Sequence, residues 1–312
     1  MIKGSLKRVL KTIIPKTIIN YINEKRKQKD FPKNWPIEKR ILVLSELYER
    51  KTGKKLNIED PKTFNEKIQW LKIYYDHKDL PKIVCKYHFK EYIREKLGSG
   101  YTIPLYGVYK SVDEIDWDSL PNSFVLKSNC SSDGNYIEIV KDKSKIDTDA
   151  MKEKMREWLK PENLLINSFC RAYYGVKPLI IAEQYVEQLD GQLYDYKFFC
   201  FNGEAKFAYV ATDHWDAYKI SVYDLSWNKT DVHYGEYPGN DVMKPKKLNE
   251  MIEIANKLAK EFPFVRVDFF ETDDQLFLSE LTFYPGGGFH DLKPDSVNYE
   301  WGNLLNLPIK HK

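Results

Sequence analysis

The sequence has few cysteines, no long apolar run and no signal-peptide pattern. Its four cysteines are far apart and form no CxxC pair or Cys/His cluster, which argues against a structural zinc site and fits a reducing compartment. No apolar run approaches the roughly 20 residues that a membrane-spanning helix needs, and no apolar core is followed by a small-residue cleavage site. We therefore expect a soluble protein of the cytoplasm.

The chain also lacks a large net charge. Lys and Arg number 49 against 46 Asp and Glu, so the formal charge is only +3, whereas a dedicated nucleic-acid binder usually carries a large basic excess. Hydrophobic residues make up 42% and charged residues 30%, which excludes disordered and low-complexity classes. A length of 312 residues suffices for one large domain or two ordinary ones.

The small net charge conceals a basic N-terminal segment. Residues 1–30 hold nine basic and two acidic residues, a net charge of +7, so the remaining chain is net −4. Isoleucine and leucine recur there at helical spacing on both sides of Pro15, which predicts two short basic amphipathic helices. They could dock on the anionic inner face of the plasma membrane or on a partner, or pack on the body as an ordinary helix pair. Loss of binding to anionic liposomes on deletion of residues 1–27 would favour the membrane interpretation.

Beyond this segment, helical and strand patterns are mixed rather than strictly alternating. Breaks are expected at Asp60-Pro61 and Leu80-Pro81, and turns at 128–135, 202–203 and 272–274. The mixture predicts an α+β fold with more than one sheet and with antiparallel hairpins. The expected helices are 36–52, 62–75, 84–97, 147–159 and 245–261, and the expected strands are 101–110, 124–127, 136–140, 179–182, 196–201, 205–211, 265–270 and 275–281.

One predicted hairpin concentrates charged residues in apolar strands. Alternation places residues 266, 268 and 270 on one face of its first strand and residues 278, 280 and 282 on one face of its second. If these faces coincide, Asp268, Glu280 and the Thr282 hydroxyl converge beside Arg266. Such a group suits Mg²⁺ bound together with phosphates. The alternative is a hairpin whose charges face water, but strands this apolar should be largely buried.

The same residues resemble a known motif. The run Arg266-x-Asp268, then Glu280-x-Thr282-x-x-Pro285-Gly286, is similar to the metal-binding end of the ATP-grasp superfamily, and closest to D-alanine–D-alanine ligases, which have Asn where this chain has Thr282. A hydroxyl can still coordinate a metal or reach it through water.

The rest of the chain resembles one branch of this superfamily, the TupA-like proteins of teichuronopeptide and capsular polysaccharide clusters. The segments that carry the resemblance are Pro61–Leu71, Leu120–Lys127, Asp195–Gly203 and Phe283–Gly286, and it covers roughly residues 40–308. It implies an ATP-grasp fold that holds a nucleotide between two antiparallel-sheet subdomains. The expected division is a basic segment 1–30, a helical region 31–98, a first subdomain 99–186 with a phosphate-covering loop, and a second subdomain 187–312 with the metal site.

The resemblance also implies roles for individual residues in binding ATP and Mg²⁺. The phosphates would meet Lys86, Lys127 and the loop 128–135, although Cys85 replaces the usual acid before Lys86. Lys127 could instead be a surface lysine, and Asp195 and Lys197 could form an ion pair without a ligand. The implied contacts are Lys86, Lys127, Ser131, Ser132, Gly134, Glu183, Gln184 (backbone), Val186 (backbone) and Asp195 for the nucleotide, Arg266 and Lys197 for catalysis, and Asp268, Glu280 and Thr282 for the metal. His290, in the loop that follows, is either a contact to the acceptor or incidental.

The reaction that the resemblance implies is ADP-forming carboxylate–amine ligation through an acyl phosphate, in bacterial surface polysaccharide biosynthesis. The expected acceptor is a small molecule or a glycan, with an amino acid joined to a uronic acid. Three alternatives remain: an ATP-grasp kinase acting on a sugar hydroxyl, a glycosyltransferase that uses a nucleotide-sugar, and a non-catalytic nucleotide-binding protein.

Overall fold

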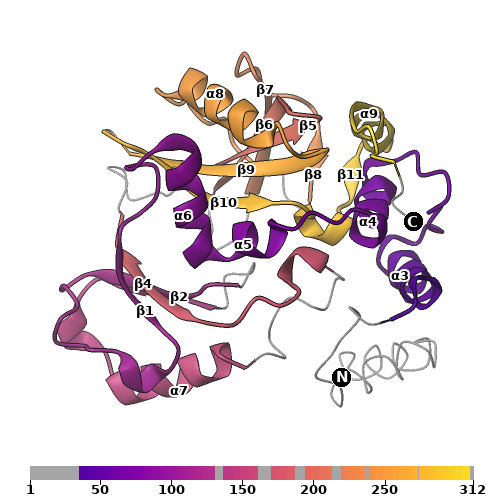
Figure 1. Ribbon diagram of the computed structural model, residues 1–312. Coiled ribbons are helices and arrows are strands. Elements are labelled where there is room, and N and C mark those ends of the chain that lie inside the picture. Colours follow the sequence, from indigo (N-terminus) through magenta and orange to yellow (C-terminus); the bar gives the residue numbers. More distant parts are fainter. Residues whose placement is uncertain are drawn as a thin grey trace, which may run out of the picture.

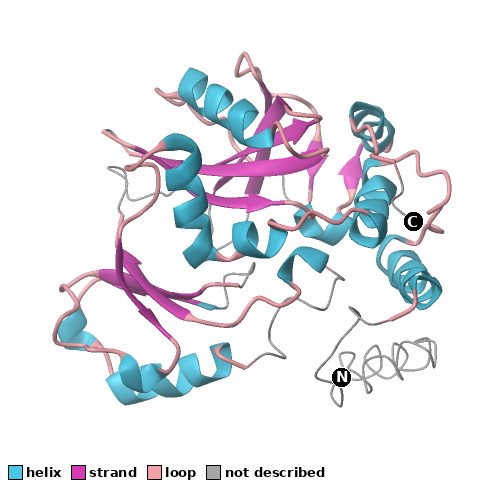
Figure 2. Cartoon of the chain, in the orientation of Figure 1, coloured by secondary structure: helices cyan, strands magenta, loops and turns pink. Residues whose placement is uncertain are grey.

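The computed structural model describes residues 35–130, 136–160, 170–186, 194–212, 219–235, 239–272 and 274–309. Within these ranges the chain combines helices with antiparallel sheets (Figures 1 and 2), so the expected α+β class is confirmed. The basic segment 1–30 lies outside the described residues, as do Ser131, Ser132 and Gly134. Among the residues that are described, no helix is long and apolar enough to cross a lipid bilayer.

The five expected helices form close to their expected bounds. Two more, α5 and α9, are absent from the prediction. The break expected at Leu80-Pro81 is in fact the start of α5, because Pro81 sits in the first helical turn, where a missing N–H costs nothing. The helices are α3 (Ile37–Thr52), α4 (Phe64–Tyr74), α5 (Leu80–Val84), α6 (Lys86–Leu97), α7 (Thr148–Trp158), α8 (Leu248–Ala259) and α9 (Ser296–Leu304).

Helix α4 begins with a capping box. The Thr63 hydroxyl accepts a hydrogen bond from the Glu66 N–H at 3.2 Å, and the Glu66 carboxylate accepts one from the Thr63 N–H at 2.9 Å. The two bonds satisfy N–H groups that have no partner within the helix. They therefore define where α4 starts, which matters because α4 packs beside the site described below.

A four-stranded antiparallel sheet contains the hairpin expected around residues 128–135. Its order is β1 (Leu105–Tyr109), β4 (Ile180–Gln184), β2 (Phe124–Ser128) and β3 (Ile137–Val140). Phe124 and Leu126 pack in one core cluster with Met155 and Trp158 of α7. Because side chains alternate along β2, Lys127 lies on the opposite face from this core.

A five-stranded antiparallel sheet forms the other half of the molecule. Its order is β10 (Leu276–Thr282), β9 (Phe264–Glu271), β5 (Asp195–Phe201), β6 (Glu204–Thr212) and β7 (Lys219–Asp224). Helix α8 covers one face, where the Cys200 sulfur approaches the Ala255 carbonyl oxygen. The strand β7 and the short pair β8 (His233–Tyr234) and β11 (Leu292–Lys293) are absent from the prediction.

The opposite face of this sheet is divided between an aromatic core and a charged region. Phe199 and Phe201 pack on Phe64 of α4, with ring centroids 6.1 and 5.8 Å apart, and Phe199 also contacts Trp301 of α9. Lys197 is the next residue of β5 on the same face. Figure 1 shows α4 and α9 at one end of the sheet and α5 and α6 between the two sheets. The charged region thus lies next to the aromatic core, on the same face of the sheet.

Candidate nucleotide and metal site

The charged residues of the β9–β10 hairpin lie opposite one another. Glu280 pairs with Asp268, and Thr282 pairs with Arg266. Residues directly opposite in an antiparallel ladder point to the same side of the sheet. The register therefore brings all four side chains together, as the alternation predicts.

A β-bulge makes this arrangement possible. Leu278 pairs with Phe269 and Glu280 pairs with Asp268, so Ser279 is an extra residue on β10. The prediction that Leu278 shares a face with Glu280 is wrong, because Phe269 and Asp268 point to opposite faces of β9. Without the bulge Glu280 would lie opposite Val267, on the wrong face.

Arg266 lies at the centre of a buried cluster. Its Nε donates to Asp268 Oδ1 at 2.7 Å, and its Nη2 donates to Asp268 Oδ2 at 2.5 Å, to Glu280 Oε1 at 3.1 Å and to Thr282 Oγ1 at 3.0 Å. Its Nη1 donates to the Tyr209 hydroxyl at 3.2 Å. Burial disfavours the guanidinium charge, but the negative groups around it, Asp268 first, hold the pKa of Arg266 well above its ordinary value.

Lys197 adds a second cation to the same carboxylate. Its Nζ lies 2.6 Å from Asp268 Oδ2 and also forms an ion pair with Asp195, two residues earlier on β5. Asp268 has no exposed surface and Lys197 is 5% exposed, so these charges are neutralised by one another rather than by water. The predicted catalytic residues, Arg266 and Lys197, thus both contact Asp268. The ion pair between Asp195 and Lys197, which the sequence left open as an alternative, is present. A contact between Lys197 and a phosphate stays a prediction.

Helix α6 connects this cluster to the other sheet through two lysines. Lys86 Nζ lies 3.5 Å from Glu280 Oε2, and Lys90 Nζ lies 2.7 Å from Glu183 Oε1 on β4. Residues four apart lie on one face of a helix, so both lysines point into the space between the sheets. Burial by itself would raise the pKa of Glu280, but the charges of Lys86, Lys197 and Arg266 lower it to about 2.

Of the other predicted nucleotide contacts, Lys86 and Asp195 belong to the charged cluster, and Lys127 pairs with Glu183. The Glu183 side chain is 3% exposed and forms ion pairs with Lys127 of β2 and Lys90, which lower the pKa of Glu183 although burial opposes them. The Gln184 N–H donates to the Pro104 carbonyl at 3.0 Å, so a backbone contact of Gln184 to an adenine must come from its carbonyl oxygen. Val186 follows the end of β4.

Comparison with known proteins identifies the family. Residues 66–306 match the family described as TupA-like ATPgrasp. The chain belongs to this family. No curated protein matches the chain.

Solved structures of ATP-grasp ligases are similar to the chain at low identity. D-alanine–D-alanine ligase of Bacillus anthracis is 16% identical, with a TM-score of 0.43 over 70% of this chain and 64% of that protein. The enzyme of Helicobacter pylori is 14% identical, with a TM-score of 0.38 over 72% and 61% of the two chains. Phosphoribosylamine–glycine ligase of Thermotoga maritima is 13% identical, with a TM-score of 0.39 over 66% and 49%. The chain therefore spans less than two thirds of the length of these relatives.

The family implies Mg²⁺, and the carboxylates fit an ion that is shared with phosphates. The Glu280 side chain is 28% exposed, and one oxygen of the buried Asp195 has no hydrogen-bond partner in the described chain. Within the described ranges, however, no three His, Cys, Asp or Glu side chains form a metal-binding group. Mg²⁺ commonly uses one or two carboxylates together with phosphate oxygens. The site thus suits a metal brought with the nucleotide rather than a metal held by protein alone.

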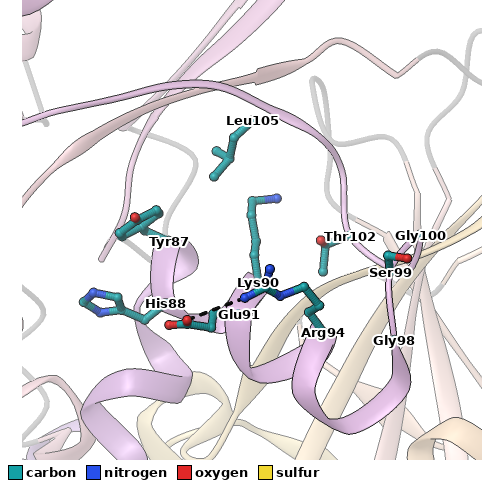
Figure 3. Close-up of a pocket in the computed structure, with 10 residues that line it drawn as sticks. All are labelled: Tyr87, His88, Lys90, Glu91, Arg94, Gly98, Ser99, Gly100, Thr102 and Leu105. Carbon is teal, nitrogen blue, oxygen red and sulfur yellow. Dashed lines mark ion pairs between the residues drawn. The ribbon is translucent and has the colours of Figure 1, made fainter.

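A pocket of about 360 Å³ lies against α6 (Figure 3). It is lined by α6 and the connection to β1, and Glu91 and Arg94 form an ion pair in its wall. Lys90 also lines the pocket, but its Nζ is bound to Glu183 and to the Ile103 carbonyl oxygen. Of the two lysines that bind Glu183, Lys90 lines the pocket and Lys127 does not.

Two residues of the site are missing from the prediction. Lys90 had a signal in the sequence, since it follows Lys86 by four residues in a predicted helix. Tyr209 had none, because its contact with Arg266 depends on the pairing of β5 with both β6 and β9.

Proposed function

We propose that the chain is an ATP- and Mg²⁺-dependent carboxylate–amine ligase. The observation that carries the proposal is the register of β9 and β10, which groups Arg266, Asp268, Glu280 and Thr282 in a chain of the ATP-grasp family. Lys86, Lys197 and Arg266 supply positive charge around these carboxylates. Such a group suits polyanionic phosphates better than a neutral ligand.

The proposed reaction has two steps. A carboxylate oxygen of one substrate attacks the γ-phosphorus of ATP, the bond to the β-phosphate oxygen breaks, and an acyl phosphate and ADP form. The amine of the second substrate then attacks the acyl carbon, phosphate leaves, and the amine loses a proton. Phosphoryl transfer needs mainly positioning and charge neutralisation from the protein.

Residues of the chain would share these tasks. Lys127, on the four-stranded sheet, and Lys86, on α6, would bind the phosphates. Lys197 and Arg266 would neutralise the transferring phosphoryl group, and Arg266 would also stabilise the tetrahedral intermediate. Asp268 and Glu280, with Thr282, would hold Mg²⁺, which would offset the negative charge of the phosphates.

The substrate pair is proposed from the family resemblance. A uronic acid would supply the carboxylate and an amino acid the amine, in the biosynthesis of a bacterial surface polysaccharide. Location in the cytoplasm, with peripheral contact to the plasma membrane through residues 1–30, belongs to the same proposal.

The deciding test is the release of ADP from Mg·ATP. We expect ADP only when glucuronic acid and an amino acid are both present, with one phosphate released per ADP. ADP release with a neutral sugar would indicate a kinase, and consumption of a UDP-sugar without ATP would indicate a glycosyltransferase. A thermal-shift series with Mg·ATP, Mg·ADP, UDP-sugars and GDP-sugars shows which nucleotide binds, since a ligand of the folded state raises the Tm by mass action.

A further inference from the structure

Helix α4 carries a polar stripe where a core-facing helix is normally apolar. Asn65, Gln69 and Lys72 lie on one face of the helix and are 3%, 0% and 2% exposed. Buried amides and ammonium groups cost free energy unless they are hydrogen-bonded. In the part of the chain that the structure describes, Lys72 forms no ion pair with a carboxylate, so its charge has to be met by neutral acceptors.

The acceptors belong to the 285–290 loop, which follows β10. Gln69 Nε2 donates to the Gly287 carbonyl at 2.9 Å and to the Gly288 carbonyl at 2.7 Å. Lys72 Nζ donates to the same Gly287 carbonyl and, at 3.1 Å, to Gln69 Oε1. A Cβ atom at Gly288 would lie 2.5 Å from Gln69 Nε2, and the φ angle of Gly288 is +69°, so this contact requires glycine.

His290 belongs to the same loop, and the charge of Arg266 acts on it. Asn65 Nδ2 donates to the His290 carbonyl at 2.8 Å, which extends the polar stripe to this residue. The imidazole lies 4.1 Å from the Tyr234 ring between centroids, and a Cβ at Gly286 would lie 1.9 Å from its Nε2. Burial and then the charge of Arg266 lower the pKa of His290 to about 4, so the ring is neutral at pH 7.

We infer that Gln69 and Lys72 are positioning residues that hold the 285–290 loop as the wall of the site that faces the acceptor. The candidate nucleotide groups lie on the four-stranded sheet, α6 and the charged cluster follow, and the loop comes shortly after Thr282, which accepts from Arg266, at the end of β10 near α4 (Figure 1). A substrate that receives the phosphoryl group therefore meets the loop. This inference rests on the proposed function.

The holding role is tested by hydrogen exchange, which needs no substrate. Lys72→Met and Gln69→Met remove the donors and keep the side-chain length. We expect amide exchange in peptides covering 283–292 to accelerate roughly tenfold or more in both variants, with exchange in β9 unchanged. The matched control is Lys67→Met, because Lys67 of the same helix donates to the Gly302 and Leu305 carbonyls, both at 2.8 Å, and not to the loop. Loop exchange in Lys72→Met and Gln69→Met that equals the wild-type rate would overturn the inference.

The acceptor-side role is tested by the split between two KM values. In ADP release with glucuronic acid and the most active amino acid, Lys72→Met and Gln69→Met should raise KM for the acceptors by roughly tenfold and leave KM for ATP within about twofold. Lys67→Met should change neither. Equal increases of both KM values would overturn the acceptor-side role. If the wild-type protein forms no ADP with any pair, the proposed function and this acceptor role both fail, and the exchange experiment still decides whether α4 holds the loop.

Discussion

Single side chains of the site are held by opposite charges in a nearly water-free setting. Asp268 is fully buried, and its two oxygens accept from Arg266 and contact Lys197. Removal of one member of such a group leaves another charge buried without compensation. Substitutions that change charge but not size are therefore the most informative ones here.

Glu280→Gln should abolish most of the activity and leave the fold intact. The amide keeps the shape of the side chain but loses the negative charge that would hold Mg²⁺ against the phosphates. We expect ADP formation to fall by roughly 100-fold or more, and the Tm to fall as well, because Lys86 and Arg266 lose the charge that pairs with them. Glu204→Gln, at an exposed position at the start of β6, is the control and should retain full activity. An active Glu280→Gln protein would remove Glu280 from the proposed metal site.

Lys72 should make stability depend on pH in an unusual direction. Burial lowers its pKa from 10.5 to about 8 in the folded protein. The buried ammonium thus opposes folding below pH 8, and the penalty disappears as the pH rises from 8 to 10.5. Relative to Lys72→Met, the wild type should gain up to about 3 kcal/mol of unfolding free energy over this window, at about 1.36 kcal/mol per pKa unit. Urea unfolding of both proteins at pH 7, 8, 9 and 10 measures it, and a constant difference would contradict the low pKa.

Among the elements, the bulge in β10 and the polar face of α4 shape the site most directly. The bulge changes which face Glu280 occupies, and α4 supplies donors to the loop that follows Thr282. Both are small local features that act on several residues at once. The bulge does so because side-chain direction in a strand depends on residue parity.

Deletion of Ser279 should keep the two carboxylates together. Loss of the extra residue would leave regular pairing, with Glu280 still opposite Asp268 and Thr282 still opposite Arg266. We expect Mg·ATP binding in calorimetry close to that of the wild type. Ser279→Ala keeps the bulge and should bind Mg·ATP as the wild type does. Loss of binding in the deletion variant, with binding intact in Ser279→Ala, would show that the site depends on the bulge itself rather than on the register.

In the molecule as a whole, α6 ties the two sheets together by charge. Lys86 reaches the five-stranded sheet at Glu280, and Lys90 reaches the four-stranded sheet at Glu183. The two lysines are one helical turn apart, so the position of α6 couples the spacing of the sheets to the charges of the site.

Lys90→Met should destabilise the protein far more than a comparable surface change. It leaves the buried Glu183 with Lys127 as its remaining ion-pair partner among the described residues. We expect a loss of about 3 kcal/mol in unfolding free energy. The side chain of Lys82 is 37% exposed and forms ion pairs with Glu91 and Glu95. Lys82→Met should therefore cost less than about 1 kcal/mol of unfolding free energy. Chemical unfolding measures both, and similar losses in the two variants would contradict a central role for Lys90.

Local information in the sequence was enough for the class of fold, five helices, three hairpins and the candidate residues Arg266, Asp268 and Glu280. These features depend on periodicity, capping and residue type within short segments. Lys90 could have been found in the same way. The family resemblance supplied the nucleotide, which no local pattern identifies.

Other features depend on contacts between segments far apart in the chain. The bulge at Ser279 is visible only against β9, Tyr209 meets Arg266 only because β5 lies between β6 and β9, and the polar residues of α4 find their acceptors more than 200 residues later. Residue periodicity specifies which face of an element is polar, but not what lies opposite that face. Packing decides which residue lies opposite. It places the buried polar residues of α4 against the carbonyl groups of the 285–290 loop, where they are hydrogen-bonded.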